Sequence, residues 1–458
     1  MNKTLAATVL ALTVSGCAIT ERNSQGKLDN NLLKGDTVGA ITLAKEKAGL
    51  DETTSKLADQ LWGMQAGSLL RMNKDYAESN KYFDSIEDVM YMEDTENVLE
   101  STGELIGSTL TNDAMLDYEQ TYYDAVMVNT YKALNFISIG DLANARIEWN
   151  RSDERQKRAA DYFASKINKQ KESLAKEDAA NADNIKKSLT ESEKLLADHH
   201  ITETEWSAYD GYINPFSTFM HGLFFMLNAQ DSSDIGKAVD SLNRVASITK
   251  TKVSSDTLKL AEKLQSGSSH VADLKKVWVV FENGQATKKE ELRVDLPLFL
   301  VSDNVAYTGI ALPKLKAFPA PYASVKVGAV ETEVVGDMDK IIQAEFKEAF
   351  PLILSKEISR AVIKTVAQKQ IKDRNPLLGF GAGLLQAATT QADTRTWSLL
   401  PKNFQAAMVD TPEQGKLTLS LGEPAASIDV DVPTDKNAIV YIKAATANAS
   451  PIIEVISL

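Results

Sequence analysis

The chain has 458 residues, of which 43% are hydrophobic, and a net charge of −13, because 63 Asp and Glu outnumber 50 Lys and Arg. This acidic balance argues against nucleic acid as a general partner, since phosphate binding requires a basic surface. The single cysteine, Cys17, excludes a disulfide within the chain, so the fold must depend on an ordinary hydrophobic core. The length indicates two or three domains.

Residues 1–16 have the pattern of an export signal. Lys3 precedes an apolar run, Leu5 to Val14, which is too short to cross a bilayer as a helix. Small residues ending with Gly16 stand directly before Cys17, and this segment resembles the lipobox of bacterial lipoproteins. The resemblance implies signal cleavage between Gly16 and Cys17, a lipid on the Cys17 sulfur and acylation of the new N-terminus. The alternative is a buried structural cysteine beside a fortuitous apolar stretch.

Export would place the mature chain, with a net charge of −14 after the loss of Lys3, on a membrane surface. Two or more acyl chains anchor a protein stably where one chain would not. Ala18 follows the cysteine, whereas an aspartate there would resemble the inner-membrane retention signal. We therefore expect a lipid anchor in the outer membrane, facing the periplasm, with residues 17–53 as lipidated N-terminus and tether. We expect no cofactor other than this covalent lipid.

Helical periodicity begins near Leu57 and contains an internal repeat, which predicts an all-α domain over residues 54–268. The repeat places a small residue where two helices approach closely and large residues around it. This spacing resembles the tetratricopeptide helix-turn-helix unit and predicts a tetratricopeptide-like solenoid. A generic helical bundle is the alternative, because Met92–Thr121 contains no matching residues. The repeat consists of Gly67, Tyr76, Ser79 and Phe83, matched 66 residues later by Ala133, Leu142, Ala145 and Trp149, and of a poorer copy with Gly222, Phe225, Ala238 and Leu242.

A charged insertion over residues 151–200 predicts a thin helical hairpin. Apolar residues at spacings of three and four form a narrow seam on each side of the polar stretch Lys176–Asn184. Such a hairpin either projects as an arm or folds back on the solenoid. The seam consists of Phe163, Ile167 and Leu174 on one side and of Ile185, Leu189 and Leu196 on the other.

The pattern changes to strands after residue 268, which predicts an α+β domain over residues 269–458. Val277–Phe281 is typical of a buried strand, and Glu282-Asn283-Gly284 after it is a hairpin signal. The alternation in the last strands predicts a mainly antiparallel, sandwich-like sheet. The further strand-like segments are Leu292–Val301, Tyr307–Leu312, Tyr322–Val335, Leu417–Leu421, Ser427–Val432, Ala438–Ala444 and Ile452–Ile456.

A long helix is predicted from Gly336-Asp337 to Lys372, laid across the sheet and interrupted near Pro351. Its basic stripe, Lys356, Arg360 and Lys364, lies opposite the apolar face, so we expect solvated side chains, with an anionic partner as the alternative.

A Gly-x-Gly-x-Gly string follows at residues 379–383. No lysine and no strand–helix–strand unit accompany it, which favours helix packing or a hinge over phosphate binding.

A second resemblance spans most of the mature chain. It rests on Tyr131–Trp149, on Asn214-Pro215-Phe216 leading to Gly222, on the strand at Val277–Phe281, and above all on Asp393–Trp397 with Leu400-Pro401. These segments resemble a largely uncharacterised family of Gram-negative lipoproteins. The resemblance implies a periplasmic lipoprotein with tetratricopeptide-like helices, no established catalytic activity and a role in envelope or peptidoglycan biogenesis.

Catalytic and metal-binding motifs are not found in the sequence. His199, His200, His221 and His270 show no ligand spacing, and no nucleophile elbow or Ser-x-x-Lys set is present. We therefore expect no catalytic residue and no metal.

The sharpest polar cluster is Asp393, Arg395 and Trp397, which could recognise a polar, anionic or sugar-like group. The alternative is an ion pair that fixes a loop, with Trp397 in the core.

Two functions remain open. The first is a protein-binding scaffold for a periplasmic or outer-membrane partner, because solenoids expose long concave surfaces. The alternative is a hydrolase or lytic enzyme that acts on an envelope polymer at the junction of the two domains. A deep pocket with two convergent titratable groups would favour the enzyme, whereas an open groove would favour the scaffold.

Overall fold

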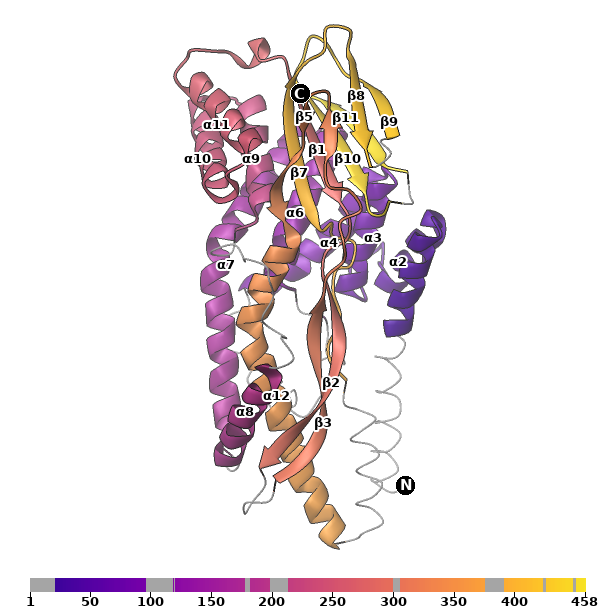
Figure 1. Ribbon diagram of the computed structural model, residues 1–458, viewed down its shortest axis with the longest axis vertical. Coiled ribbons are helices and arrows are strands. Elements are labelled where there is room, and N and C mark those ends of the chain that lie inside the picture. The colour runs from indigo at the N-terminus through magenta and orange to yellow at the C-terminus, as the bar shows by residue number, and fades with distance from the viewer. Residues whose placement is uncertain are drawn as a thin grey trace.

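The computed structural model describes residues 21–95, 118, 120–177, 182–197, 213–299, 305–374, 391–422, 426–447 and 450–458. These residues form an elongated molecule with a helical N-terminal part and a C-terminal part that contains mixed sheets (Figure 1). The export signal, Cys17, His199, His200 and the glycine string lie outside the described residues.

Helices joined by short turns make up the N-terminal part. Residues 21–33 are helical and α2 (Thr37–Ala48) follows, so much of the expected tether is folded. The reason is an apolar strip, since Leu28, Ala40 and Ala44 are fully buried in one cluster with residues of α3. The next helices are α3 (Gln60–Met72), α4 (Tyr76–Thr95), α6 (Tyr122–Ser138), α7 (Leu142–Glu177), α8 (Ala182–Ala197), α9 (Pro215–Leu227), α10 (Ser232–Thr249) and α11 (Lys252–Gln265).

Helices α3 and α4 pack closely through Gly67. A Cβ atom at this position would come within 2.7 Å of the ring of Phe83, and Ser79 Oγ donates a hydrogen bond to the Gly67 carbonyl oxygen at 2.7 Å. Helices α9 and α10 show the same relationship, because a Cβ at Gly222 would lie 2.7 Å from Leu242. The other repeat residues are mostly buried: Tyr76, Ala133, Ala145, Trp149, Phe225 and Ala238, with Leu142 38% exposed.

A five-stranded sheet in the order β11-β10-β1-β7-β6 forms the centre of the C-terminal part. The strand β1 pairs with β10 in parallel and with β7 antiparallel, and the other neighbours are antiparallel. The strands are β1 (Lys276–Asn283), β6 (Glu333–Asp337), β7 (Asn403–Asp410), β10 (Ala438–Ala444) and β11 (Ile452–Ser457).

Both faces of this sheet are covered, which explains the unbroken apolar run in β1. Trp278 and Val280 belong to the large core shared with α3, α6 and α9. Val277, Val279 and Phe281 pack on a second sheet in the order β5-β4-β8-β9. Its strands are β4 (Val325–Val327), β5 (Val330–Glu331), β8 (Lys416–Leu421) and β9 (Ala426–Asp431).

The predicted hairpin after β1 is wrong. The chain turns at Gly284, where φ is +71°, and leaves the sheet. The next strand, β2 (Lys288–Phe299), pairs with β3 (Val305–Lys316) as a separate ribbon. A hairpin is prevented because β7 and β10, from distant parts of the sequence, already occupy both edges of β1.

The long helix α12 (Met338–Arg374) also differs from the prediction. It continues through Pro351, which is exposed, and it runs away from the central sheet beside β2, β3 and α8 (Figure 1). Because α12 is enclosed there, Arg360 of the expected solvated stripe is buried and pairs with Glu357. The shared core contains Ile185 and Leu196 of α8, Leu296 and Leu298 of β2, Ile310 and Leu312 of β3, and Phe350, Leu354 and Ile358 of α12.

The second helix of the predicted hairpin insertion therefore packs on the β2–β3 ribbon and on α12. This helix forms part of the lower half of the molecule in Figure 1. It is therefore not a free arm, and it does not fold back on the other helix pairs, as the two predicted alternatives had it.

Candidate functional site

Half of β7 has an open edge within the described part of the chain. The strand β6 pairs with β7 only from Asn403 to Ala406. Before Glu333 the chain crosses to the second sheet, where Thr332 N donates to the Val325 carbonyl oxygen at 2.9 Å. Thr332 Oγ fixes the crossing by donating to Gln405 Oε1 at 2.6 Å. Among the described residues, no strand is hydrogen-bonded to residues 407–410 of β7 on the side away from β1, although β5 and α11 lie close to β7.

The pairing with β1 sets the direction of the backbone groups at this edge. Thr411 N donates to the Lys275 carbonyl oxygen at 3.0 Å, which fixes the register next to the pair of Lys276 and Asp410. Residues in an antiparallel ladder alternate between those that bond to the neighbour and those that point away. By this alternation the N–H and C=O groups of Met408 and Asp410 point away from β1, toward the open edge.

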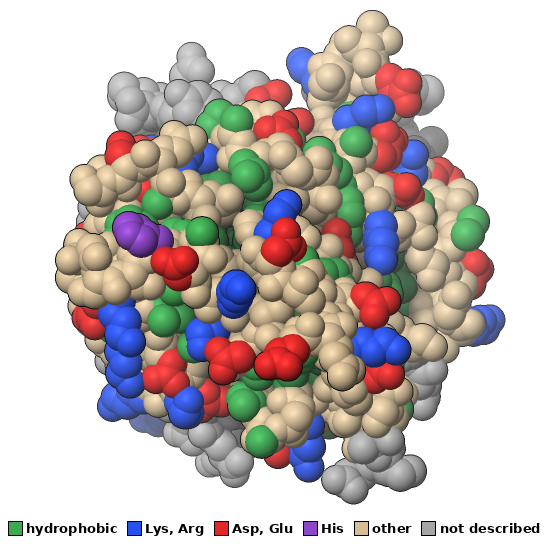
Figure 2. Space-filling view, turned by 90° about the horizontal axis from the view of Figure 1, so that it is seen from above, with side chains coloured by type: hydrophobic (Ala, Val, Ile, Leu, Met, Phe, Trp, Pro, Cys, Tyr) green, Lys and Arg blue, Asp and Glu red, His purple; other side chains and the backbone are tan. Residues whose placement is uncertain are grey.

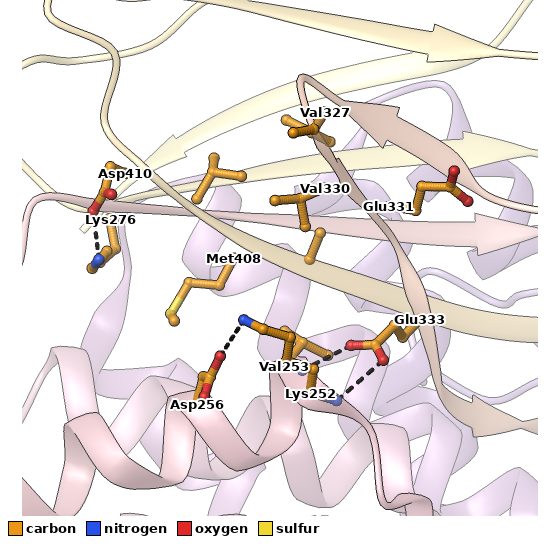
Figure 3. Close-up of a pocket in the computed structure, with 13 residues that line it drawn as sticks. Lys252, Val253, Asp256, Lys276, Val327, Val330, Glu331, Glu333, Met408 and Asp410 are labelled. Carbon is orange, nitrogen blue, oxygen red and sulfur yellow. Dashed lines mark hydrogen bonds and ion pairs between the residues drawn. The ribbon is translucent and has the colours of Figure 1, made fainter.

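A groove of about 440 Å³ lies beside this edge (Figure 3). One wall is the start of α11, with Val253, and the other is the β4–β5 turn, with Val327 and Val330; Met408 lies between them. The side chain of Val330 is 39% exposed, although it is a large aliphatic residue. The groove therefore combines a lining that is partly apolar and partly charged with backbone groups that point toward it, and its volume is in the usual range for binding sites.

The charged residues around the groove are already partnered. Lys252 Nζ lies 2.5 Å from Asp256 and Lys276 Nζ lies 2.5 Å from Asp410. The Glu333 carboxylate accepts hydrogen bonds from the backbone N–H groups of Lys252, at 3.1 Å, and Val253, at 2.8 Å, and so caps the start of α11. The hydrogen bond from Lys252 is the main reason that the pKa of Asp256 lies below its usual value.

The lining nevertheless has an excess of acid. It contains two lysines, Lys252 and Lys276, and four carboxylates, so that its net charge is −2. The carboxylates are Asp256, Glu331, Glu333 and Asp410, and the side chain of Asp410 is 84% exposed. A partner segment with basic side chains would complement this charge.

The cluster predicted from sequence is found elsewhere and forms part of the packing. Arg395 donates to both carboxylate oxygens of Asp393, at 2.9 and 2.8 Å. Burial raises the pKa of Asp393, but this ion pair outweighs burial and leaves the pKa below its usual value. Trp397 is fully buried, its Nε1 donates to Ser68 Oγ at 2.9 Å, and its ring meets that of Tyr131 edge-on at 5.8 Å.

A buried ionic cluster between α4, α6 and α7 was not predicted. Lys132, which is 2% exposed, pairs with Glu87 and with Glu148, and Asn129 Nδ2 donates to both carboxylates at 2.9 and 2.7 Å. Burial raises the pKa of Glu87, but the charge of Lys132 outweighs it and the pKa lies below its usual value. Polar residues at buried helical positions, such as Asn129 and Lys132, were the signal that could have revealed this cluster.

Two of the four histidines lie in the described residues. His221 is buried and its Nδ1 lies 2.9 Å from Ser241 Oγ, while His270 is exposed before a short 3-10 turn. Within the described ranges, no group of three or more His, Cys, Asp or Glu side chains is placed to hold a metal ion. No helix in these ranges is long and apolar enough to span a membrane.

Comparison with known proteins gave no match to a family model, to a curated protein or to a solved structure. The groove beside β7 is therefore characterised by its own geometry alone.

Proposed function

We propose that this protein is a membrane-anchored scaffold of the Gram-negative envelope that holds a protein partner in the groove beside β7. The observation that carries the proposal is the open edge of residues 407–410 next to a groove lined by apolar and acidic residues. An unpaired strand edge exposes backbone donors and acceptors, which other chains readily engage. In this proposal the lipid on Cys17 holds the molecule at the outer membrane, facing the periplasm, and envelope or peptidoglycan biogenesis is the process served.

The helical part would be the support on which the groove is built. We propose that the pairs α3–α4, α6–α7 and α9–α10 are tetratricopeptide-like units with insertions. The close contacts of Gly67 with Phe83 and of Gly222 with Leu242 support this. Because the helices share one core with the central sheet, the sheet covers surface that an open solenoid would present to a partner.

The shape and charge of the groove favour the scaffold over a hydrolase. The groove is open, and its ion pairs and the helix cap by Glu333 already engage most of its titratable side chains. The convergent carboxylates Glu87 and Glu148 lie elsewhere, buried and paired with Lys132 and Arg151, although burial raises the pKa of Glu148 above its usual value. An acid–base pair would need a titratable group that is free to exchange a proton with substrate. Figure 2 shows acidic and basic side chains interspersed over one end of the molecule, so that this face has no large patch of one sign.

The proposal is tested by photo-crosslinking in cells. A benzophenone amino acid replaces Val330, 39% exposed, or Leu142, 38% exposed, in the full-length lipidated chain. We expect a discrete protein adduct from position 330 that is not formed from position 142. Identical adducts from both positions, or none from position 330, would contradict a partner in the groove.

A further inference from the structure

We infer that the groove binds an extended segment of its partner as an added strand, antiparallel to β7, with apolar and basic side chains in alternation. This inference rests on the proposed function and specifies how the partner is held. It starts from the chain crossing at Thr332, since β6 would have covered the rest of β7 if it had continued in line.

The size of the open edge sets the length of the segment. Residues 407–410 of β7 span about 14 Å at roughly 3.4 Å per residue, so about four residues of a partner would pair with them. Met408 and Asp410 would each exchange N–H and C=O bonds with the residue opposite. The added strand would take the place that β6 leaves and keep its antiparallel direction, which gives the better bond geometry of the two orientations.

The two faces of β7 determine which side chains fit. Ala407 and Val409 pack with the core between the two sheets, whereas Met408 packs with the helical core. Directly opposite residues of an antiparallel pair point to the same face. Side chains opposite Ala407 and Val409 would therefore meet Val327 and Val330, and apolar residues suit these two positions.

Side chains on the other face of the added strand would lie near charged residues of the groove. Residues opposite Met408 and Asp410 point toward the start of α11, where Asp256 and Glu333 lie. Within the described residues Asp410 forms an ion pair with Lys276, and its side chain is 84% exposed, so a lysine or arginine of the partner could share it. With a net charge of −2 around the groove, basic side chains at these positions are favoured over acidic ones.

The test uses a labelled, end-blocked peptide of sequence Thr-Val-Lys-Val-Lys-Val-Thr and the full lipidated chain in detergent, with affinity measured by fluorescence anisotropy. Two derivatives distinguish the edges of the added strand. N-methylation of the lysines removes the N–H groups that would bond to Met408 and Asp410, whereas N-methylation of the valines removes N–H groups that face away. We expect the first derivative to lose at least about tenfold in affinity and the second to lose no more than about threefold.

Variants of the protein test the same hydrogen bonds from the side of β7. Met408→Pro removes an N–H group that points to the groove, at an edge position where proline is tolerated, and Met408→Thr keeps that group. We expect binding to be lost in the proline variant and kept in the threonine variant, with circular dichroism confirming that both are folded. Val330→Lys, which places a charge among the apolar residues, should weaken binding even if Met408→Pro does not fold.

Three results would overturn the inference: no binding of the parent peptide at millimolar concentration, equal affinity of the two N-methylated peptides, or unchanged binding to Val330→Lys. None of these affects the crosslinking result at position 330. Failure of strand addition and failure of the scaffold proposal can therefore be told apart.

Discussion

Lys443 Nζ lies 3.3 Å from the carbonyl oxygen of Arg71, and both basic side chains are buried where the end of α3 meets the central sheet. The Arg71 guanidinium stands 5.1 Å from the ring centres of both Tyr131 and Tyr441. Glu282 accepts a hydrogen bond from Tyr441 Oη at 2.6 Å, and its carboxylate lies 3.8 Å from the Arg71 guanidinium. The helical part and the sheet are thus joined by a charged contact as well as by the shared apolar core.

This contact predicts a pH dependence of stability. Burial, followed by the charge of Arg71, lowers the pKa of Lys443 from 10.5 to about 7. Between pH 7 and 10.5 the unfolded chain therefore binds more protons at this site than the folded chain, and the free energy of unfolding rises with pH. Lys443→Met should be more stable than the wild type near pH 7 and should lack this rise.

Urea unfolding at several pH values measures the effect. Lys416→Met, which changes an exposed lysine of β8, is the control and should keep the wild-type slope. An unaltered slope in Lys443→Met would show that the lysine is solvated in the folded state.

His221 predicts a loss of stability in acid. Burial lowers its pKa from 6.5 to about 4, so the unfolded chain binds the extra proton in this window and the free energy of unfolding falls as the pH falls from 6.5 to 4. His221→Gln should flatten this part of the profile, whereas His270→Gln, at an exposed position, should not. Parallel profiles for all three chains would contradict the buried, neutral state of His221.

The packing of α3 on α4 predicts opposite effects of two glycine-to-alanine changes. Gly67→Ala should destabilise the protein by about 1–3 kcal/mol, because the new methyl group would meet the Phe83 ring at 2.7 Å. Gly236→Ala, inside α10 with nothing within 4 Å, should stabilise it by up to about 1 kcal/mol through helix propensity. Thermal unfolding of both variants checks the pair, and a neutral Gly67→Ala would mean that the helices are not in close contact there.

The lipid anchor predicts the behaviour of Cys17→Ser. Without the sulfur no thioether can form, so the variant should leave the outer-membrane fraction, while the wild-type mature chain should be heavier than residues 17–458 by its acyl groups. Mass spectrometry and fractionation decide this. Lipidation at this residue would be excluded if Cys17→Ser still fractionated with outer membranes and differed in mass from the wild type only by the exchange of sulfur for oxygen.

The elements that were predicted well are those set by local pattern. The run Val277–Phe281 identified a buried strand, and Gly67, Ser79 and Phe83 were placed on two adjoining helices. What failed depended on distant parts of the chain. The hairpin signal after β1 had no effect, because β7 and β10 occupy both edges of that strand.

The groove could not have been predicted from the sequence. Its residues come from α11, β1, the β4–β6 segment and β7, which are far apart along the chain. The crossing at Thr332 lies within an alternating stretch, Val330–Val334, that has the pattern of a single strand. The place where the chain leaves the β7 edge is shown only by the hydrogen bonds of Thr332 to Val325 and to Gln405, which lie in different sheets.

The most direct test of a partner strand at the β7 edge is the yield of the crosslink from position 330 in cells that carry either Met408→Pro or Met408→Thr in the lipidated chain. If a partner strand pairs with β7, the adduct is retained with threonine and lost with proline, at equal amounts of folded protein. An equal yield in both backgrounds would contradict a partner held at this edge.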